Sequence, residues 1–212
     1  MFLLVGLGNP GPKYANHRHN VGFMWIDRLR SAWGADAFRD KFKGQYARAT
    51  VGRTDVVLLK PETFMNLSGE SVQAAMTFFK VPLDHVLVAH DEMDLPFETL
   101  RLKRGGGTAG HNGLKSIVAH VGAEFARLRI GVGRPPGPMR PDVFVLSPFD
   151  AVESARLGEV LDEGTRAATD FLESGLEPAM QRLHAGPSGG GGKKGGNSPP
   201  SAPASGAPKR TG

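Results

Sequence analysis

A short apolar run, Val86–Ala89, passes directly into the polar segment His90–Asp94. Four consecutive apolar residues followed by charges predict a strand that is buried on both faces, as in a largely parallel sheet. Three carboxylates and a histidine at the end of such a strand cost solvation energy unless they are paired with other groups or serve a function. In open α/β sheets, chemistry gathers at the carboxyl ends of the strands. The segment therefore favours an open α/β sheet with a functional site at His90–Asp94.

Strand-like and helix-like stretches alternate along the rest of the chain. Strands are predicted at residues 2–7, 46–51, 56–60, 99–103 and 127–132, with a last one at 143–146. Helices are predicted at 20–33, 68–80, 112–121 and 176–184, and a long one runs from a capping-box-like start at Asp150 to about Glu173. Strands interleaved with helices predict an α/β domain with a parallel or mixed sheet.

The composition changes abruptly at Pro187. Residues 187–212 are almost entirely Gly, Pro, Ser, Ala, Lys and Arg, without a large apolar side chain. We expect them to form a disordered tail, which either solubilises the protein or attracts RNA weakly. Residues 1–186 are expected to form the single folded domain.

The net charge of +5 is unevenly distributed. Four positive charges and no acid lie in the tail, so the remaining chain is close to neutral. Within it, residues 99–141 carry eight Lys or Arg side chains against one acid, Glu124. This suits a local contact with a polyanion, although the charges could also be solvated faces of separate elements.

The composition also excludes several classes of protein. The chain has no cysteine, which excludes disulfides, thiolate metal sites and a cysteine nucleophile. No apolar run approaches the roughly 18 residues of a membrane helix. The apolar start, Met1–Gly6, has no preceding basic region and no cleavage site, so it predicts a strand rather than a signal peptide. A cytoplasmic protein without membrane contact is therefore expected.

Gly6–Gly11 matches the dinucleotide pattern G-x-G-x-x-G directly after the first predicted strand. An oxidoreductase with a nucleotide cofactor is therefore one alternative. However, Pro10 removes a backbone N–H from the loop that would hold pyrophosphate. The predicted helix also begins about nine residues after Gly11, so its N-terminus is too far away to receive a phosphate. These details argue against the alternative, and no cofactor is expected.

His19 lies between Arg18 and Asn20, just before a predicted apolar helix. A histidine with a carboxylate on its far nitrogen is the usual general base for activating water. Asp91 is the candidate carboxylate, although the sequence does not show that the two residues meet. Metal binding at His90–Asp94 is an alternative, but the chain has no H-E-x-x-H motif and no EF-hand loop. It has no G-x-S-x-G serine motif either, so hydrolysis by activated water, without a metal, is favoured.

Two further motifs introduce predicted helices. Thr63–Gly69 contains Asn66, which is either a site residue or only a turn residue, and Ser68 is the predicted N-cap. Gly105–Gly113 is a glycine loop that contains Asn112. Such a loop lets the backbone approach a phosphate or ribose closely, unless it is only a flexible linker.

Taken together, these motifs resemble those of bacterial-type peptidyl-tRNA hydrolases. The matching segments follow in family order over about residues 2–184: VGLGNPG at 5–11, Tyr14, Arg18-His19-Asn20, TFMNLSG at 63–69, VAHDEMD at 88–94, residues 105–114 and RLRIGVG at 127–133. Thr108-Ala109 departs from the pattern, and the tail after Gly186 has no counterpart. The resemblance implies a three-layer α/β/α domain with a twisted mixed sheet, monomeric and without metal or cofactor.

The resemblance also implies a reaction: hydrolysis of the ester between a peptide and the 3′ ribose of tRNA, which recycles tRNA released prematurely from ribosomes. His19 would be the general base, and Asp91 would orient it. Asn9 would contact the peptide next to the ester and help to reject free aminoacyl-tRNA. Asparagine amides both donate and accept hydrogen bonds, so they can bind a peptide backbone whatever its side chains.

The implied partner is peptidyl-tRNA, bound through its acceptor stem, its 3′ end and the nascent peptide. The residues implied to line the site for the 3′ end and the peptide are Tyr14, Phe64, Asn66 and Asn112. Lys103 and Arg129 match the family's clamp on the tRNA 5′ phosphate. An alternative is a family member that binds RNA without hydrolysis, as splicing-associated relatives are thought to do. The presence of His19, Asp91 and Asn9 argues against it.

Overall fold

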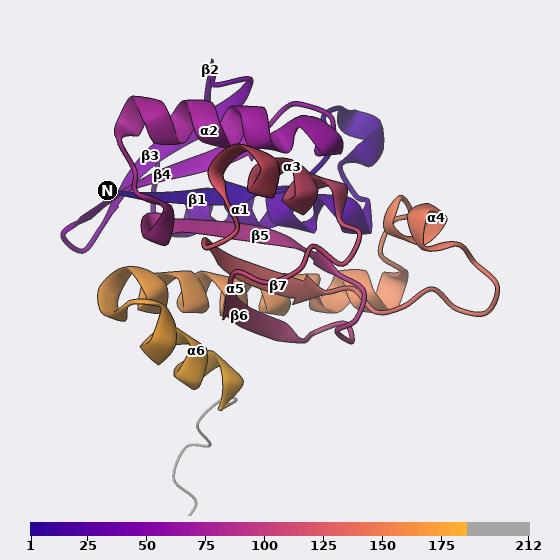
Figure 1. The fold of residues 1–212 in the computed structure, drawn as a ribbon. Coiled ribbons are helices and arrows are strands. Elements are labelled where there is room, and N and C mark those ends of the chain that lie inside the picture. The colour runs from indigo at the N-terminus through magenta and orange to yellow at the C-terminus, as the bar shows by residue number, and fades with distance from the viewer. Residues whose placement is uncertain (186–212) are drawn as a thin grey trace, which may run out of the picture.

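The computed structural model describes residues 1–185, and the tail expected at 187–212 lies outside them. A seven-stranded sheet runs through the domain in the order β2-β3-β4-β1-β5-β7-β6 (Figure 1). The strands are β1 Phe2–Gly6, β2 Arg39–Lys41, β3 Gly44–Val51, β4 Thr54–Pro61, β5 Val86–Glu92, β6 Leu100–Arg104 and β7 Ala126–Gly131. The central strands β4, β1, β5 and β7 are parallel, whereas β2, β3 and β6 pair with antiparallel neighbours. The expected mixed sheet is confirmed.

Helices cover both faces of the sheet, which confirms the three-layer architecture (Figure 1). The helices α2 (Ser68–Phe79) and α3 (Asn112–Val121) lie on one face, and α1 (Val21–Ala32), α5 (Ala151–Ser174) and α6 (Leu176–His184) lie on the other. Side chains of β1 alternate between the two layers: Leu3 and Val5 pack with α2 and α3, and Leu4 packs with α1. None of the helices in residues 1–185 is both long and apolar enough to span a membrane.

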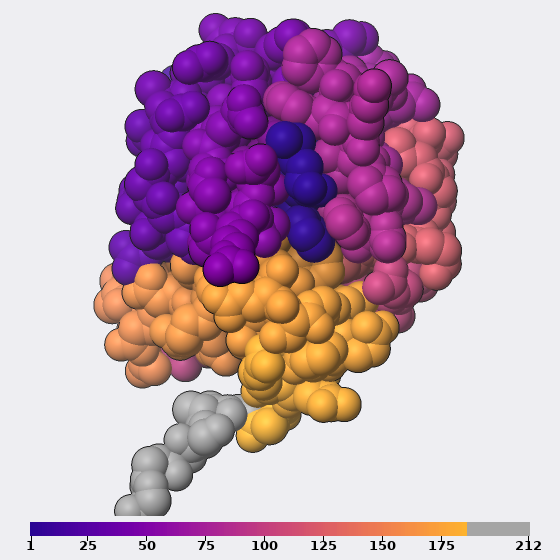
Figure 2. Space-filling view, turned by 90° about the vertical axis from the view of Figure 1, so that its left-hand side faces the viewer, coloured from indigo at the N-terminus to yellow at the C-terminus, as the bar shows by residue number. Residues whose placement is uncertain are grey.

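The C-terminal helices complete the second layer. Asp150 and Glu153 form the predicted capping box at the start of α5. Figure 2 shows the molecular face where β1 begins, with the C-terminal helices packed beneath it. The carboxyl ends of β1 and β5 lie at the opposite edge of the sheet (Figure 1).

Two local predictions differ from the structure, and one strand was not predicted. Residues 143–146 do not form a strand but contribute to the short helix α4 (Pro141–Val145), in which Pro141 occupies the first turn. Ser68 is not an N-cap, because a 3₁₀ turn at Met65–Leu67 leads directly into α2 and the Ser68 hydroxyl donates to the Met65 carbonyl at 2.8 Å. The edge strand β2 was not predicted, since its three residues are all charged and exposed.

The connections of the sheet create a crevice. β1 leads through α1 to β2, β3 and β4 on one side, and α2 then carries the chain across to β5 on the other side of β1. Such a reversal is a topological switch point, where open α/β sheets bind their ligands. The sequence-predicted site residues of β1 and β5 therefore meet at this edge.

Candidate active site

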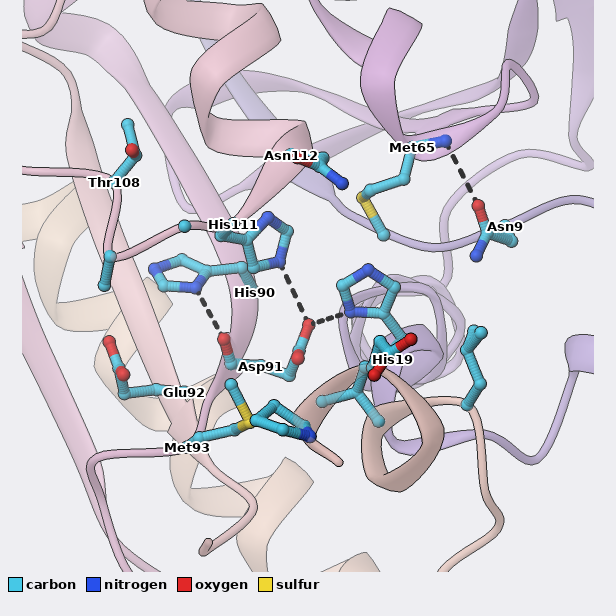
Figure 3. A pocket seen from close by; sticks show the side chains of 16 residues that line it. Asn9, His19, Met65, His90, Asp91, Glu92, Met93, Thr108, His111 and Asn112 are labelled. Carbon is cyan, nitrogen blue, oxygen red and sulfur yellow. Dashed lines mark hydrogen bonds and ion pairs between the residues drawn. The ribbon is translucent and has the colours of Figure 1, made fainter. Parts of the chain in front are cut away.

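The predicted pair of His19 and Asp91 forms at the switch point. Asp91 lies near the end of β5, which runs to Glu92, and its side chain is buried. His19 lies in the 3₁₀ turn Arg18–Asn20 that precedes α1. Its Nδ1 is 2.8 Å from Asp91 Oδ1 (Figure 3). The structure thus brings together two side chains that are 72 residues apart in the sequence.

Gly22 explains why this turn can lie over Asp91. A Cβ on Gly22 would stand 2.6 Å from the Leu7 carbonyl oxygen and 2.7 Å from the Ala89 carbonyl oxygen. Only a glycine lets the first turn of α1 lie directly against the ends of β1 and β5. Two glycines of the G-x-G-x-x-G segment serve the same packing, because a Cβ on Gly6 would lie 2.1 Å from the Gly22 carbonyl oxygen and one on Gly8 would lie 2.7 Å from the Phe23 ring. Two 3₁₀ turns separate this segment from α1.

A second histidine, His111, also contacts Asp91. Its Nε2 lies 3.0 Å from the same oxygen, Asp91 Oδ1. Its Nδ1 accepts the backbone N–H groups of Gly113 and Leu114 at the start of α3, at 3.2 and 3.4 Å. Because Nδ1 accepts, the ring proton must be on Nε2, which donates to Asp91.

The two imidazoles stabilise a charged Asp91. Burial alone would raise the pKa of Asp91, but His19 and His111 hold this pKa far below its ordinary value. Burial alone would lower the pKa of His19, but the charge of Asp91 and its hydrogen bond raise that pKa above its ordinary value. The Nε2 of His19 points away from Asp91 into a cavity (Figure 3). His19 can therefore exchange a proton with a bound molecule.

His90 fixes the backbone beside this group. Its Nδ1 donates to the Asp91 carbonyl oxygen at 2.8 Å. Burial lowers the pKa of His90 to about 3, so its ring is neutral at physiological pH. Its Nε2 has no hydrogen-bond partner within residues 1–185.

Asn9 is held in one orientation by its neighbours. Its backbone N–H donates to Asn20 Oδ1 at 3.0 Å, and Asn20 Nδ2 donates back to the Asn9 carbonyl at 2.9 Å. The side-chain Oδ1 of Asn9 accepts the Met65 N–H at 3.1 Å. These bonds leave the amide nitrogen of Asn9 as a donor that points toward His19 (Figure 3).

A cavity of about 550 Å³ opens beside these groups. Of the predicted site residues, Asn9, His19, Asp91 and Asn112 line it. Tyr14, Phe64 and Asn66 do not line it. Phe64 and Asn66 are exposed on either side of Met65, which does. The opposite wall comes from α4 and the residue after it, through Pro141, Asp142, Val145 and Leu146.

Arg18 joins this wall to the His19 turn. The buried guanidinium donates to the Ser147 hydroxyl at 2.9 Å and to the Pro148 carbonyl, and it pairs with Glu153 at 2.5 Å. It also lies over the Phe144 ring, 4.3 Å from the ring centre. Arg18 thereby holds the segment between α4 and α5 against the turn that carries His19.

A second cavity of about 340 Å³ adjoins the first and is basic. Lys103, Arg127 and Arg129 line it together with one acid, Glu92, which pairs with Arg129 at 2.9 Å. The two predicted phosphate-binding residues, Lys103 and Arg129, are thus brought together. Both cavities share His90, Glu92, Thr108 and Ala109 in their walls.

One group in residues 1–185 has the composition of a metal site. The possible ligand atoms of His19, Asp91 and His111 lie within 4.8 Å of one another. Here, however, the nitrogens nearest Asp91 carry the protons of its two hydrogen bonds. A metal would displace both protons, and His111 would lose its role as acceptor at the start of α3. The hydrogen bonds thus favour proton transfer over metal binding at this cluster.

The site contains residues that the sequence reasoning did not assign: His111, Asn20, Met65, Arg18 and Arg127. His111 had a local signal, because His-Asn-Gly follows a glycine loop and begins a well-patterned helix. Asn20 and Arg18 flank His19 but had no signal of their own. Their partners are distant in sequence, so only the folded chain identifies them.

The fold and the site define an α/β enzyme with a histidine–aspartate pair at the switch point of its sheet. A family model described as "Peptidyl-tRNA hydrolase" matches residues 3–190. The peptidyl-tRNA hydrolase of Sorangium cellulosum is 53% identical over 193 residues, which cover 90% of this chain and 86% of that protein. The peptidyl-tRNA hydrolase of Exiguobacterium sibiricum is 44% identical over 87% of this chain and 100% of its own length.

Solved structures agree with these relatives. The crystal structure of peptidyl-tRNA hydrolase from Acinetobacter baumannii superposes with a TM-score of 0.81 at 39% identity, covering 87% of this chain and 95% of that one. The chain belongs to the peptidyl-tRNA hydrolase family.

Proposed function

We propose that this protein hydrolyses the ester bond between the peptide and the 3′ ribose of peptidyl-tRNA, with His19 as the general base. The reaction is that of its family, and the protein is an enzyme of that family. The proposed residue roles rest on one observation. Asp91 accepts hydrogen bonds from both His19 and His111, while the Nε2 nitrogen of His19 faces the cavity. This arrangement suits the activation of a water molecule.

In the proposed reaction, His19 Nε2 accepts a proton as the water oxygen attacks the ester carbonyl carbon. Asp91 stabilises the imidazolium that forms, because its charge lies 2.8 Å from Nδ1. The tetrahedral intermediate then collapses and breaks the bond to the ribose oxygen. His19 returns its proton to that oxygen, which gives a free peptide carboxyl group and a free tRNA hydroxyl.

The amides of Asn9 and Asn112 are proposed to hold the peptide next to the ester. Both residues line the cavity, and the free donor of Asn9 points toward His19. A donor in this place pairs with a peptide carbonyl oxygen but finds no acceptor on a free ammonium group. Asn9 therefore favours N-blocked over free aminoacyl-tRNA.

The RNA is proposed to extend from the catalytic cavity to the basic one. Lys103 and Arg129 would hold the tRNA 5′ phosphate, and Tyr14, Phe64 and Asn66 would contact the 3′ end at the rim. Exposed aromatic rings such as Phe64 can stack on unpaired bases. We propose that the protein acts as a cytoplasmic monomer on peptidyl-tRNA released prematurely from ribosomes.

The test measures peptide release from N-acetyl-aminoacyl-tRNA by the purified protein in the presence of a chelator. General-base assistance contributes roughly 10²–10⁴-fold, so His19→Ala should lose about that much in kcat while its melting temperature stays close to the wild-type value. Binding of the tRNA without release by the wild type would indicate an RNA-binding protein instead. Near-normal turnover by folded His19→Ala would remove His19 from the mechanism.

A further inference from the structure

Arg127 is a buried cation whose position the proposed reaction does not explain. Its side chain lies on β7 and is only 2% exposed. The guanidinium donates to the carbonyl oxygens of Gly106 and Gly107, at 2.9 and 2.7 Å. No carboxylate in residues 1–185 forms an ion pair with it, although a guanidinium remains charged at neutral pH. The guanidinium carbon also lies 4.8 Å from the centre of the Phe125 ring. Because the hydrogen bonds of this buried cation all go to one short segment, its effect on the structure is expected at that segment.

That segment is the glycine loop between β6 and α3. Its backbone is unusual, because Ala109 has a φ of 44°, in the left-handed region that L residues rarely adopt. Within residues 1–185, the two Arg127 bonds are the only hydrogen bonds that reach residues 106–110 from outside the loop. Arg127 is therefore the polar tether of a loop that has little intrinsic preference for its conformation.

The loop ends at His111, the second donor to Asp91. The His111 N–H donates to the Thr108 carbonyl at 2.8 Å, so the position of the ring depends on the loop backbone. A continuous set of contacts thus runs from Arg127 through Gly107 and Thr108 to His111 and Asp91. Thr108 also lies in the wall of both cavities.

We infer that Arg127 is a positioning residue: it holds the glycine loop so that His111 donates to Asp91. The inference rests on the proposed function. It assigns Arg127 a different task from Lys103 and Arg129, the other two cations of the basic cavity. Those two are proposed to hold the tRNA 5′ phosphate, whereas both terminal nitrogens of Arg127 donate to the loop.

The test uses a minimal N-acetyl-aminoacyl ester that lacks the tRNA body, so that loss of phosphate binding does not affect the result. Arg127→Gln should lower kcat by roughly 10- to 100-fold, because a small displacement of a positioned group costs that much. KM should change little. The matched control is Arg104→Gln, which removes one exposed positive charge next to the same loop and should keep wild-type kcat.

A spectroscopic measurement separates positioning from general destabilisation. The protons that His19 and His111 share with Asp91 should give low-field proton NMR signals. In Arg127→Gln the His111 signal should be lost or shifted, while Arg104→Gln keeps both signals. Arg127→Lys retains the charge but replaces the two fixed terminal nitrogens of the guanidinium with a single ammonium on a flexible stem. The geometry of the two bonds to the loop should therefore change, and kcat should also fall.

The outcomes decide between the proposals. A folded Arg127→Gln protein with wild-type kcat and both signals would overturn the inference. If the Arg127→Gln variant does not fold, the Arg127→Lys variant tests the inference. Wild-type kcat and wild-type signals in Arg127→Lys would overturn it. A lower kcat with an altered His111 signal would support it. Failure of the wild type to release the peptide from N-acetyl-aminoacyl-tRNA would instead refute the proposed function.

Discussion

Asp91 accepts hydrogen bonds from His19 and His111, and these two bonds determine the charge of Asp91 and the pKa of His19. The two donors keep Asp91 charged, and the charge raises the pKa of His19. A base must be neutral to accept a proton from water. Since the pKa of His19 is raised, kcat/KM should increase as the pH rises through a value above the ordinary histidine pKa of 6.5.

Asp91→Asn tests the role of this charge. The amide keeps the shape of the carboxylate but not the charge that raises the pKa of His19, so that pKa should fall. The acidic limb of the pH profile of kcat/KM should therefore shift to lower pH. The maximum rate should drop by roughly 10²-fold or more, because the imidazolium loses its partner. An unmoved acidic limb would contradict this role, and a trapped covalent peptidyl–Asp91 species would assign Asp91 as the nucleophile instead.

Asn9 is the residue expected to distinguish N-blocked from free aminoacyl-tRNA. Its Oδ1 is engaged by Met65, so only its amide donor faces the cavity. Asn9→Asp replaces that donor with a carboxylate, which attracts a free ammonium group. The ratio of kcat/KM for N-blocked over free substrate should narrow in Asn9→Ala and narrow further in Asn9→Asp. The same ratio in all three proteins would exclude Asn9 from selection.

At the scale of elements, the start of α1 determines where His19 lies. Gly22 places this helix against the backbone of β1 and β5, and the preceding turn then lies over Asp91. Arg18 fastens the same turn to the segment between α4 and α5. The turn that carries His19 is thus held by contacts on both of its sides.

Gly22→Ala should displace α1 from the sheet. We expect a loss of about 1–3 kcal/mol in unfolding free energy, as for other overpacked sites, and a fall in kcat because His19 moves with the helix. The matched control is Gly158→Ala in α5, where no atom of residues 1–185 other than adjoining residues and the local helix backbone lies within 4 Å of the new Cβ. That substitution should stabilise the helix slightly and leave kcat unchanged. Thermal unfolding and kcat of the two variants provide the comparison, and equal kcat values would argue against placement of His19 by Gly22.

At the scale of the whole molecule, the basic cavity rather than the net charge should bind RNA. Lys103 and Arg129 stand in adjacent strands, β6 and β7, and line the same cavity. The sheet thus places the cavity proposed to bind the ester next to the cavity proposed to bind a phosphate. Residues 187–212 contribute four positive charges and no acid to the net charge.

A salt titration of tRNA affinity tests whether the basic cavity, rather than the charge of residues 187–212, binds the RNA. Lys103→Gln combined with Arg129→Gln should flatten the dependence of log K on log salt, by about 0.7–0.9 for each phosphate that the protein no longer neutralises. Deleting residues 187–212 should change the slope less. A flatter slope after the deletion, with an unchanged slope in the double variant, would locate the RNA-binding surface elsewhere.

Much of the fold follows from local patterns in the sequence. The apolar run Val86–Ala89 predicted a buried strand, and Asp150 with Glu153 predicted the start of α5, because strand burial and helix capping depend on neighbouring residues. The strand predicted at 143–146 was wrong, since Pro141 allows a helical turn there and the short run has no clear period. His19, Asp91 and Asn9 were found from motifs.

By itself, the sequence therefore determined the order of the elements and the chemical types available for the site. Only the tertiary structure decided which side chains meet. The second donor to Asp91 comes from a loop 20 residues away, and its proton is placed by the backbone of α3. Arg127, on β7, likewise meets the glycine loop 20 residues away in the sequence, where it donates to the Gly107 carbonyl. Such contacts depend on how the sheet brings distant segments together, and no local pattern records that.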